Sequence, residues 1–209
     1  MTGGLSIEDI LDLRAYERVR DDYRQRVMAL KRRRRVPLGP IATVVFECWD
    51  TVRFQVQEMA RAERIATDGG IQHELDVYNR LLPAPGDLSA TLFLELTSEA
   101  DLRQWLPRLV GIERALALEV GAPGAGPQAV VVSEPEASHA ESLTRETVTP
   151  AVHYLRFPFD DAARRRFAAE PAALAARHPE YEARTQLDDA VRAELLADLE
   201  GRTEPLPLC

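Results

Sequence analysis

Two ionisable side chains lie on apolar segments of the chain and are suited to acid–base chemistry. Glu47 belongs to IATVVFEC and His153 to VHYLRF, and both segments are rich in the residues that favour strands. Because a buried ionisable group needs a partner, we expect either a structural network or a functional pocket. In the network, Glu47 pairs with Arg53 or Arg156; in the pocket, Glu47, Arg53 and His153 hold an anionic or redox-active ligand.

The structural interpretation is favoured by the surroundings of the histidine. In a strand, His153 shares a face with Leu155 and Phe157, a position typical of a core histidine with satisfied hydrogen bonds. The catalytic residues, if the protein is an enzyme, stay unidentified, because the chain has no Gly-x-Ser-x-Gly, Walker or His-Glu-x-x-His motif.

The arginine tract in ALKRRRRVPLGP offers a second kind of chemistry. It can be the solvated end of a helix, whose dipole favours cations, or a docking surface for a protein or an anion. Nucleic acid is disfavoured, because the chain carries a net charge of −8 and no aromatic residues alternate with the basic ones. The predicted partner- or anion-binding residues are Lys31, Arg32, Arg33, Arg34, Arg35, Arg53, Arg61 and Arg64.

Cysteines and carboxylates give weaker signals. Cys48 and Cys209 form no Cys-x-x-Cys pair, and strand alternation favours Cys48 as a small buried hydrophobe over a reactive thiol at a helix start. We predict no metal site, since Glu58, Glu63 and His73 match no paired-ligand spacing, and we assign no cofactor.

The elements that must position these residues indicate an α+β fold. The patterns predict a helix from about residue 14 into the arginine tract and another from Asp50 or Thr51. Strands are expected over 41–48, 88–97 and 150–159, with a hairpin over 114–120 and 128–133 and a surface loop over 134–149. The predicted architecture is an antiparallel or mixed sheet of about five strands packed against helices, with a helical C-terminal region.

The domain organisation follows from the same patterns. Residues 1–160 are expected to form an α+β core domain and 161–209 a helical C-terminal extension and tail. The apolar spacing from Leu187 to Leu199 suits a homodimer interface, although a core helix is the more frequent use of such spacing. No run of eighteen apolar residues and no signal-like N-terminus occurs, so we expect a cytoplasmic protein without a membrane partner.

Four segments together carry a resemblance: ALKRRRRVPLGP, FECWDTVRFQVQEMARAERI, GIQHELDVYNRLLP and VHYLRF. They resemble an uncharacterised bacterial family with a domain of unknown function, over roughly residues 5–160. Members are often encoded beside rubrerythrin-like and iron–sulfur heterodisulfide-reductase-like proteins, so the resemblance implies such a partner and a link to redox or oxidative-stress chemistry. The family usually has Asn at the position of Cys48, which argues against an essential thiol.

Two functional hypotheses therefore remain. The leading one is a non-catalytic accessory protein that binds a protein partner through the basic surface. The alternative is an enzyme or small-molecule-binding protein whose pocket contains Glu47, Arg53 and His153. They differ in one testable way: docking needs exposed arginines, whereas the pocket needs its three side chains to converge.

Overall fold

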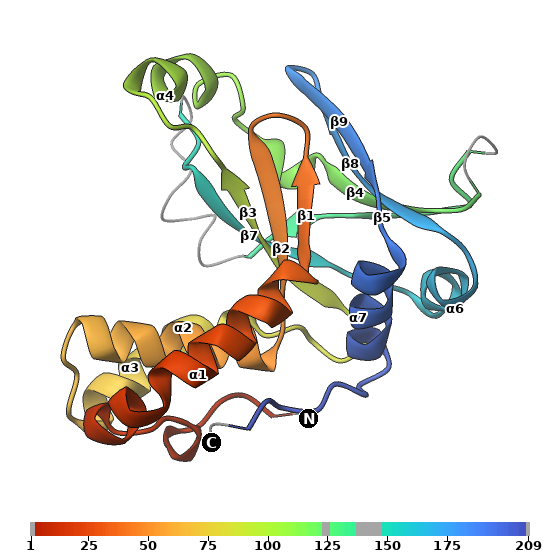
Figure 1. Cartoon of the computed structure of the whole chain (residues 1–209). Helices are drawn as coiled ribbons and strands as arrows, with labels where there is room; N and C mark the ends of the chain where they lie inside the picture. The colour runs from red at the N-terminus through yellow and green to blue at the C-terminus, as the bar shows by residue number, and fades with distance from the viewer. Residues whose placement is uncertain (1–2, 123–125, 137–147, 208–209) are drawn as a thin grey trace.

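Two antiparallel sheets and a layer of helices make up the chain, whose computed structural model describes residues 3–122, 126–136 and 148–207 (Figure 1). The first sheet has five strands in the order β1-β2-β3-β7-β6, and the second has four in the order β5-β4-β8-β9. The strands are β1 (Arg35–Leu38), β2 (Ala42–Glu47), β3 (Leu88–Leu94), β4 (Leu116–Val120), β5 (Ala129–Val132), β6 (Glu134–Pro135), β7 (Val152–Phe157), β8 (Ala172–His178) and β9 (Tyr181–Gln186).

The described helices lie at both ends of the sequence and between the strands. Ser6 and Asp9 form a capping box around the first short helix. The α-helices are α1 (Leu13–Arg32), α2 (Trp49–Ala62), α3 (Asp68–Tyr78), α4 (Glu99–Trp105), α6 (Asp161–Ala169) and α7 (Asp189–Leu199), and the 3-10 helices are η1 (Ile7–Asp9), η2 (Asn79–Leu81) and η3 (Ile112–Arg114).

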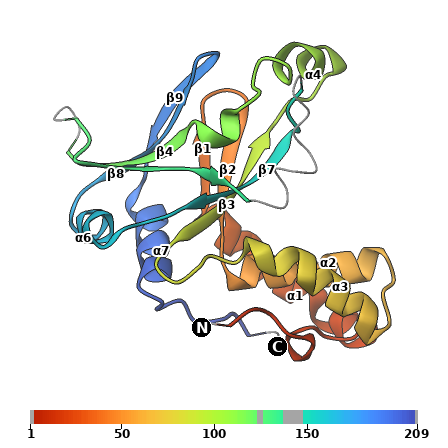
Figure 2. The same cartoon turned by 180° about the vertical axis from the view of Figure 1, so that it is seen from behind.

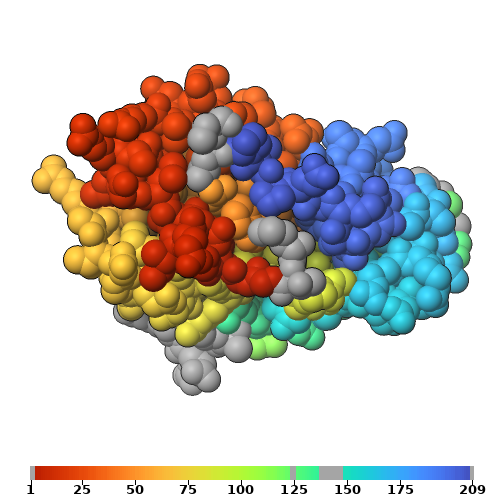
Figure 3. Space-filling model, turned by 90° about the horizontal axis from the view of Figure 1, so that it is seen from below, coloured from red at the N-terminus to blue at the C-terminus, as the bar shows by residue number. Residues whose placement is uncertain are grey.

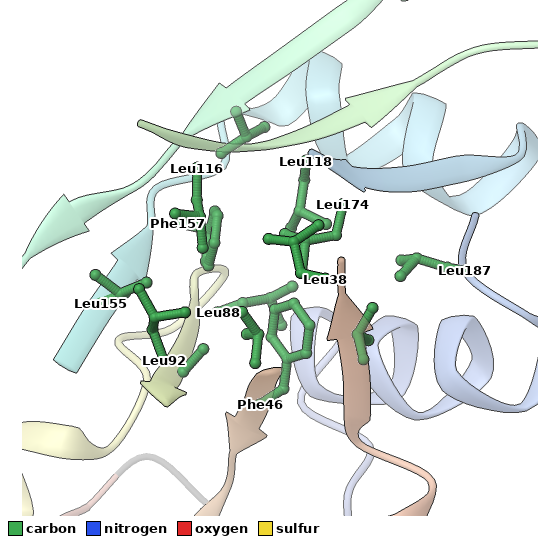
Figure 4. Close-up of a cluster of buried hydrophobic side chains, with 14 of the residues drawn as sticks. Leu38, Phe46, Leu88, Leu92, Leu116, Leu118, Leu155, Phe157, Leu174 and Leu187 are labelled. Carbon is green, nitrogen blue, oxygen red and sulfur yellow. The ribbon is translucent and has the colours of Figure 1, made fainter. Parts of the chain in front are cut away.

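The core lies between the two sheets. Phe46 and Leu88 project from the five-stranded sheet toward Leu118 and Leu174 of the four-stranded sheet, as Figure 4 shows. Each fully buried side chain of this kind contributes about 1.5–3 kcal/mol through removal from water. Residues on both sides of the expected domain boundary at residue 160 share this cluster, including Leu195 of α7.

The sheets are joined along both sides. On one side, Ser133 alone separates β5 from β6, so the chain passes directly from one sheet to the other. On the other side, β9 faces β1: the Tyr181 hydroxyl donates to the Leu38 carbonyl at 2.5 Å, and the Thr185 hydroxyl donates to the Pro37 carbonyl at 2.6 Å. The two sheets therefore pack face to face and are linked along both sides.

A helical layer formed by α1, α2 and α3 packs beside the strands (Figures 1 and 2). Tyr16, Tyr23 and Val27 of α1 are buried against Phe54 of α2. Val52 and Val56 of α2 and Leu75 of α3 form a second cluster, against which Tyr154 of β7 packs. The layer therefore packs against the end of the five-stranded sheet at which Tyr154 lies, on the face that points away from the core.

The α+β prediction is confirmed, and so are the strands expected near 41–48, 88–97 and 150–159 and the hairpin of β4 and β5. The four-stranded sheet is additional. In the region 161–209, which was expected to be helical, α6 and α7 are helices, but residues 172–186 form β8 and β9. Pairing with β4 overrides the helix propensity of the alanines in β8.

Some local predictions need correction. Helix α2 starts one residue before Asp50, with Cys48 as its N-cap, because the Thr51 hydroxyl accepts from the Cys48 amide at 2.9 Å. Of the segment 134–149, residues 137–147 lie outside the described part, and Glu134–Pro135 form β6. In the part of the chain that is described, no helix is long and apolar enough to cross a membrane.

Candidate functional site

Glu47 lies buried at the end of β2, on the face turned toward the helical layer. Its carboxylate accepts hydrogen bonds from the Thr51 hydroxyl at 2.5 Å and the Thr91 hydroxyl at 2.6 Å. The space beside it is too small for a water molecule. Glu47 therefore belongs to a structural network, which is the interpretation that the sequence favoured. Its partners are threonines and not the arginines that we expected.

The two expected arginine partners of Glu47 are engaged elsewhere. Arg156 pairs with Asp87 at 2.7 Å. The Arg53 Nε–H donates to the Asp9 carbonyl at 2.8 Å, and its guanidinium carbon lies 4.9 Å from the centre of the Trp49 ring. Arg53 thus ties the N-terminal segment to α2.

His153 points to the opposite face of the sheet from Glu47. Glu47 lies in register with Ser89 and Arg156, and His153 is three residues before Arg156, so strand alternation directs it into the core. There its Nε2 is 3.2 Å from the Thr149 hydroxyl, and its Nδ1 is 3.9 Å from the Glu113 carboxylate. The structure therefore does not bring Glu47, Arg53 and His153 together in one pocket.

The arginine tract spans the change from helix to strand. Helix α1 ends at Arg32, and Arg35 begins β1. Arg34 is 0% exposed; its guanidinium contacts Asp198 at 2.5 and 2.9 Å and Glu194 at 3.4 Å.

Most of the other predicted binding residues also have internal partners. Arg33 pairs with Glu194, Arg35 with Glu95 and Arg61 with Glu17, each at 2.6 Å. Within the described ranges, the residues of the set without a carboxylate partner or a buried backbone contact are Lys31, Arg32 and Arg64. The Lys31 ammonium lies 5.7 Å from the Phe54 ring centre, whereas Arg32 and Arg64 are exposed.

A cavity of about 560 Å³, which the sequence did not indicate, lies where the chain ends meet. Figure 3 shows this face, with the N-terminal and C-terminal segments beside each other. Five segments supply its walls: Gly3–Gly4, the start of α2, the loop of residues 82–86, the end of α7 and the segment after it. Further lining residues are Asn79 and Arg164.

The start of α2 gives the cavity two buried ionisable groups. Cys48 is 2% exposed, and burial raises the pKa of its thiol to about 11, although Arg34 acts in the opposite direction. Asp50 is 1% exposed, and both of its carboxylate oxygens lie 3.0 Å from the amide nitrogen of Leu206. Burial raises the pKa of Asp50 above its usual range, against the effects of the Leu206 bond and of Arg53 and Arg34.

The remaining charged groups of the cavity are paired. Asp198 binds Arg34, Glu200 binds Arg202, and Arg164 binds Asp161. Asp50 has no ion pair within the described residues, so it is the carboxylate of the cavity with the least charge compensation. No group of three or more His, Cys, Asp or Glu in the described ranges could hold a metal ion.

Residues 4–199 match the model of a family described as "Protein of unknown function (DUF3501)". The chain belongs to the DUF3501 family. It is also similar to a crystal structure titled "novel protein of unknown function" from Burkholderia pseudomallei K96243, with 37% identity and a TM-score of 0.83. That match covers 95% of this chain and 99% of the other. Comparison with curated proteins gives no match.

Membership of DUF3501 confirms the resemblance to a family of unknown function. The implied proximity to rubrerythrin-like and iron–sulfur proteins stays a prediction. The DUF3501 match includes the loop of residues 82–86, the start of α2 and the end of α7, whereas the cavity wall formed by residues 200–205 lies beyond it.

Proposed function

We propose that this DUF3501 protein binds a small molecule in the cavity at the start of α2. The observation that carries the proposal is a 560 Å³ cavity with the buried, incompletely compensated carboxylate of Asp50 in its wall. Cavities of about 300–1,000 Å³ with a few convergent polar groups are typical of ligand sites. Side chains with shifted pKa values, here Cys48 and Asp50, favour the same interpretation.

The lining residues favour a ligand with an apolar body and a cationic or hydrogen-bond-donating group. Trp49, Leu82 and Leu199 supply apolar surface, and prolines 83, 85 and 205 add to it. Asp50 attracts a donor or a cation rather than an anion. This site therefore differs in place and in charge from the anion pocket that the sequence suggested.

Binding is better supported than thiol catalysis. A thiol with a pKa of about 11 stays protonated at neutral pH, and the thiolate is the nucleophilic form. Cys48 accordingly contributes a neutral, polarisable surface to the cavity.

The test is a ligand search with a blocked cavity as reference. Small molecules released from the purified protein, and a metabolite library screened by thermal shift, would be compared with Ala84→Trp, which places an indole at the cavity rim. Ala190→Trp, an exposed position near the start of α7, is the matched control. We expect a ligand that stabilises the wild type and Ala190→Trp, with about tenfold weaker binding to Ala84→Trp.

Two results would count against the proposal. One is a ligand that binds Ala84→Trp and the wild type with equal affinity, which would place binding elsewhere. The other is the absence of any stabilising compound in host extract and library.

The second candidate function is docking of a protein partner, through a surface smaller than the sequence suggested. Arg32 is exposed at the end of α1, and Arg64 at the end of α2 is exposed as well, without internal ion pairs among the described residues. A redox partner of acidic character, such as a rubrerythrin-like or iron–sulfur protein, would bind Arg32→Glu/Arg64→Glu less well at low salt. Equal binding of the double variant would exclude these two arginines as the docking site.

A further inference from the structure

The segment after α7, residues 201–207, supplies part of the cavity wall, and we call it the strap. Gly201 has a φ of +66°, which turns the chain after the helix ends at Leu199. From Arg202 to Pro207 the chain forms neither helix nor strand. Thr203 and Pro205 of the strap line the cavity.

Leu206 holds the far end of the strap. The Leu206 amide donates to the Asp50 carboxylate, and the Leu206 side chain packs against the cluster of Tyr16, Tyr23, Val27 and Phe54. At the near end, the Thr203 hydroxyl donates to Asp198 at 2.6 Å. Both carboxylates that receive the strap are therefore cavity residues.

The strap is a weakly held wall of the cavity. Its glycine, Arg202, Glu204, Pro205 and Pro207 are exposed, whereas Cys48 and Asp50 opposite them are buried in the first turn region of α2. Segments with few buried contacts and no ladder of backbone hydrogen bonds open with a lower free energy than the core. Opening of the strap would uncover Asp50 and remove the only hydrogen bond that its carboxylate receives among the described residues.

We propose that the strap regulates entry to the cavity by competing with the ligand for Asp50. In the closed state, the Leu206 amide occupies the carboxylate. When the strap opens, the cationic or hydrogen-bond-donating group of the ligand replaces that amide. This inference rests on the proposed function, since it assigns the control of the same site.

The test reads strap opening through the thiol of Cys48, in a Cys209→Ser background so that one cysteine remains. Labelling by N-ethylmaleimide would be followed by intact-protein mass spectrometry. Leu206→Ala removes the side-chain anchor and Leu206→Pro also removes the amide donor. Glu204→Ala, on the exposed surface of the strap, is the matched control.

We expect Cys48 to be labelled about tenfold faster in Leu206→Ala and faster again in Leu206→Pro, with Glu204→Ala equal to the background protein. Unchanged labelling in both Leu206 variants would overturn the proposal that the strap controls entry to the cavity. If Leu206→Pro does not fold, hydrogen exchange of the Leu206 amide in the wild type decides: exchange faster than that of the β3 amides supports the strap, and exchange at the global unfolding rate overturns it.

This outcome is independent of the ligand search. If Cys48 is labelled fast in the Leu206 variants but the ligand search finds no ligand, the strap is a movable cover and small-molecule binding is rejected. A ligand that binds equally well to the background protein and to Leu206→Ala would support the binding function and reject its control by the strap.

Discussion

The guanidinium of Arg34 is buried between α1 and α7, although it belongs to a run that looks like a surface patch. Its partners Asp198 and Glu194 follow it by 164 and 160 residues. Its Nε has no hydrogen-bond partner among the described residues, so the two carboxylates carry its whole compensation. Arg34 therefore acts as an internal tie between the two ends of the chain.

We predict that Arg34→Ala lowers the free energy of unfolding by about 3–5 kcal/mol, because it leaves Asp198 buried without its partner. Arg32→Ala, two positions earlier in the same tract and exposed, should change it by less than about 0.5 kcal/mol. Denaturant unfolding monitored by circular dichroism measures both. Equal effects of the two substitutions would show that the tract is a solvated surface instead.

Glu58 forms a second tie, between α1 and α2. It accepts from Arg20 Nε and Nη2 and from the Tyr16 hydroxyl, all at 2.8 Å. The hydrogen bonds from Arg20 lower the pKa of Glu58 below its usual value of 4.5, although burial acts against them. The folded chain thus favours the ionised form.

This shift sets the pH dependence of the contact. We expect Glu58→Gln to cost about 1–2 kcal/mol of unfolding free energy at pH 7. The pKa of Glu58 is lower in the folded chain than in the unfolded chain. The stabilisation by its ionised carboxylate is therefore complete above pH 4.5 and disappears as the pH falls through the folded-state pKa. Unfolding curves from pH 7 to pH 2 test this, with the exposed Glu63→Gln as control; a cost that persists at pH 2 would contradict it.

At the scale of elements, the turn between β1 and β2 fits closely against β9. Gly39 has a φ of +73°, and a Cβ at this position would lie 2.5 Å from the Tyr181 hydroxyl oxygen. That hydroxyl also donates to the Leu38 carbonyl. One tyrosine therefore fixes the seam between the two sheets and the conformation of the turn.

We predict that Gly39→Ala costs roughly 1–3 kcal/mol of stability, from backbone strain and the collision with Tyr181. Tyr181→Phe alone should cost about 1 kcal/mol, mainly from the loss of the hydrogen bond to the Leu38 carbonyl, since the bond from the Ile41 amide is long at 3.4 Å. The double variant should lose less than the sum, because Tyr181→Phe removes the shortest contact of the added Cβ, although the contact with Ala183 at 3.0 Å stays. Additive costs in a double-mutant cycle would mean that the turn and β9 do not interact.

The elements that the sequence reveals are those with local signals. Alternating β-branched and apolar residues identify β2, β3 and the hairpin of β4 and β5. Strand β1 contains Pro37 and follows a charged tract, and β8 is rich in alanine, so neither has a local strand pattern. β1 and β8 become strands because they pair with β2 and β4, and a pattern within one segment cannot reveal such pairing.

At the scale of the whole molecule, the last fifty residues complete the core. β8 lies in the interior of the four-stranded sheet, and Phe167 and Leu195 are 0% exposed in the cluster that contains Phe46. A helical appendage added to a finished domain would not share buried side chains in this way.

We therefore expect residues 1–160 alone to lack a cooperative unfolding transition. The truncated chain leaves β4 without β8 and removes the acidic partners of Arg34. Calorimetry and near-ultraviolet circular dichroism of the fragment, with the full chain as reference, measure this. A sharp transition in the fragment would establish the boundary near residue 160 that the sequence suggested.

The candidate site depends on the arrangement of the whole molecule more than the individual helices and strands do. The burial of Glu47 and His153 followed from their apolar neighbours, but their opposite orientations follow from strand register. The cavity is assembled from five separate segments, mostly loops and chain ends, whose positions depend on the entire fold. The residues Asn79, Asp198 and Thr203 carry no local signal for a shared site; Gly and Pro around 82–86 indicate only a turn.

The single residue between β5 and β6 has a mechanical consequence. Because one peptide segment serves as the edge of both sheets, and Ser133 also donates to the Glu113 carbonyl at 2.8 Å, sliding of one sheet over the other would have to stretch the backbone itself. We therefore expect β2, β3, β4 and β8 to tumble with one rotational correlation time in solution. We expect larger independent motion in segments that are attached to the two sheets at one end, such as the strap.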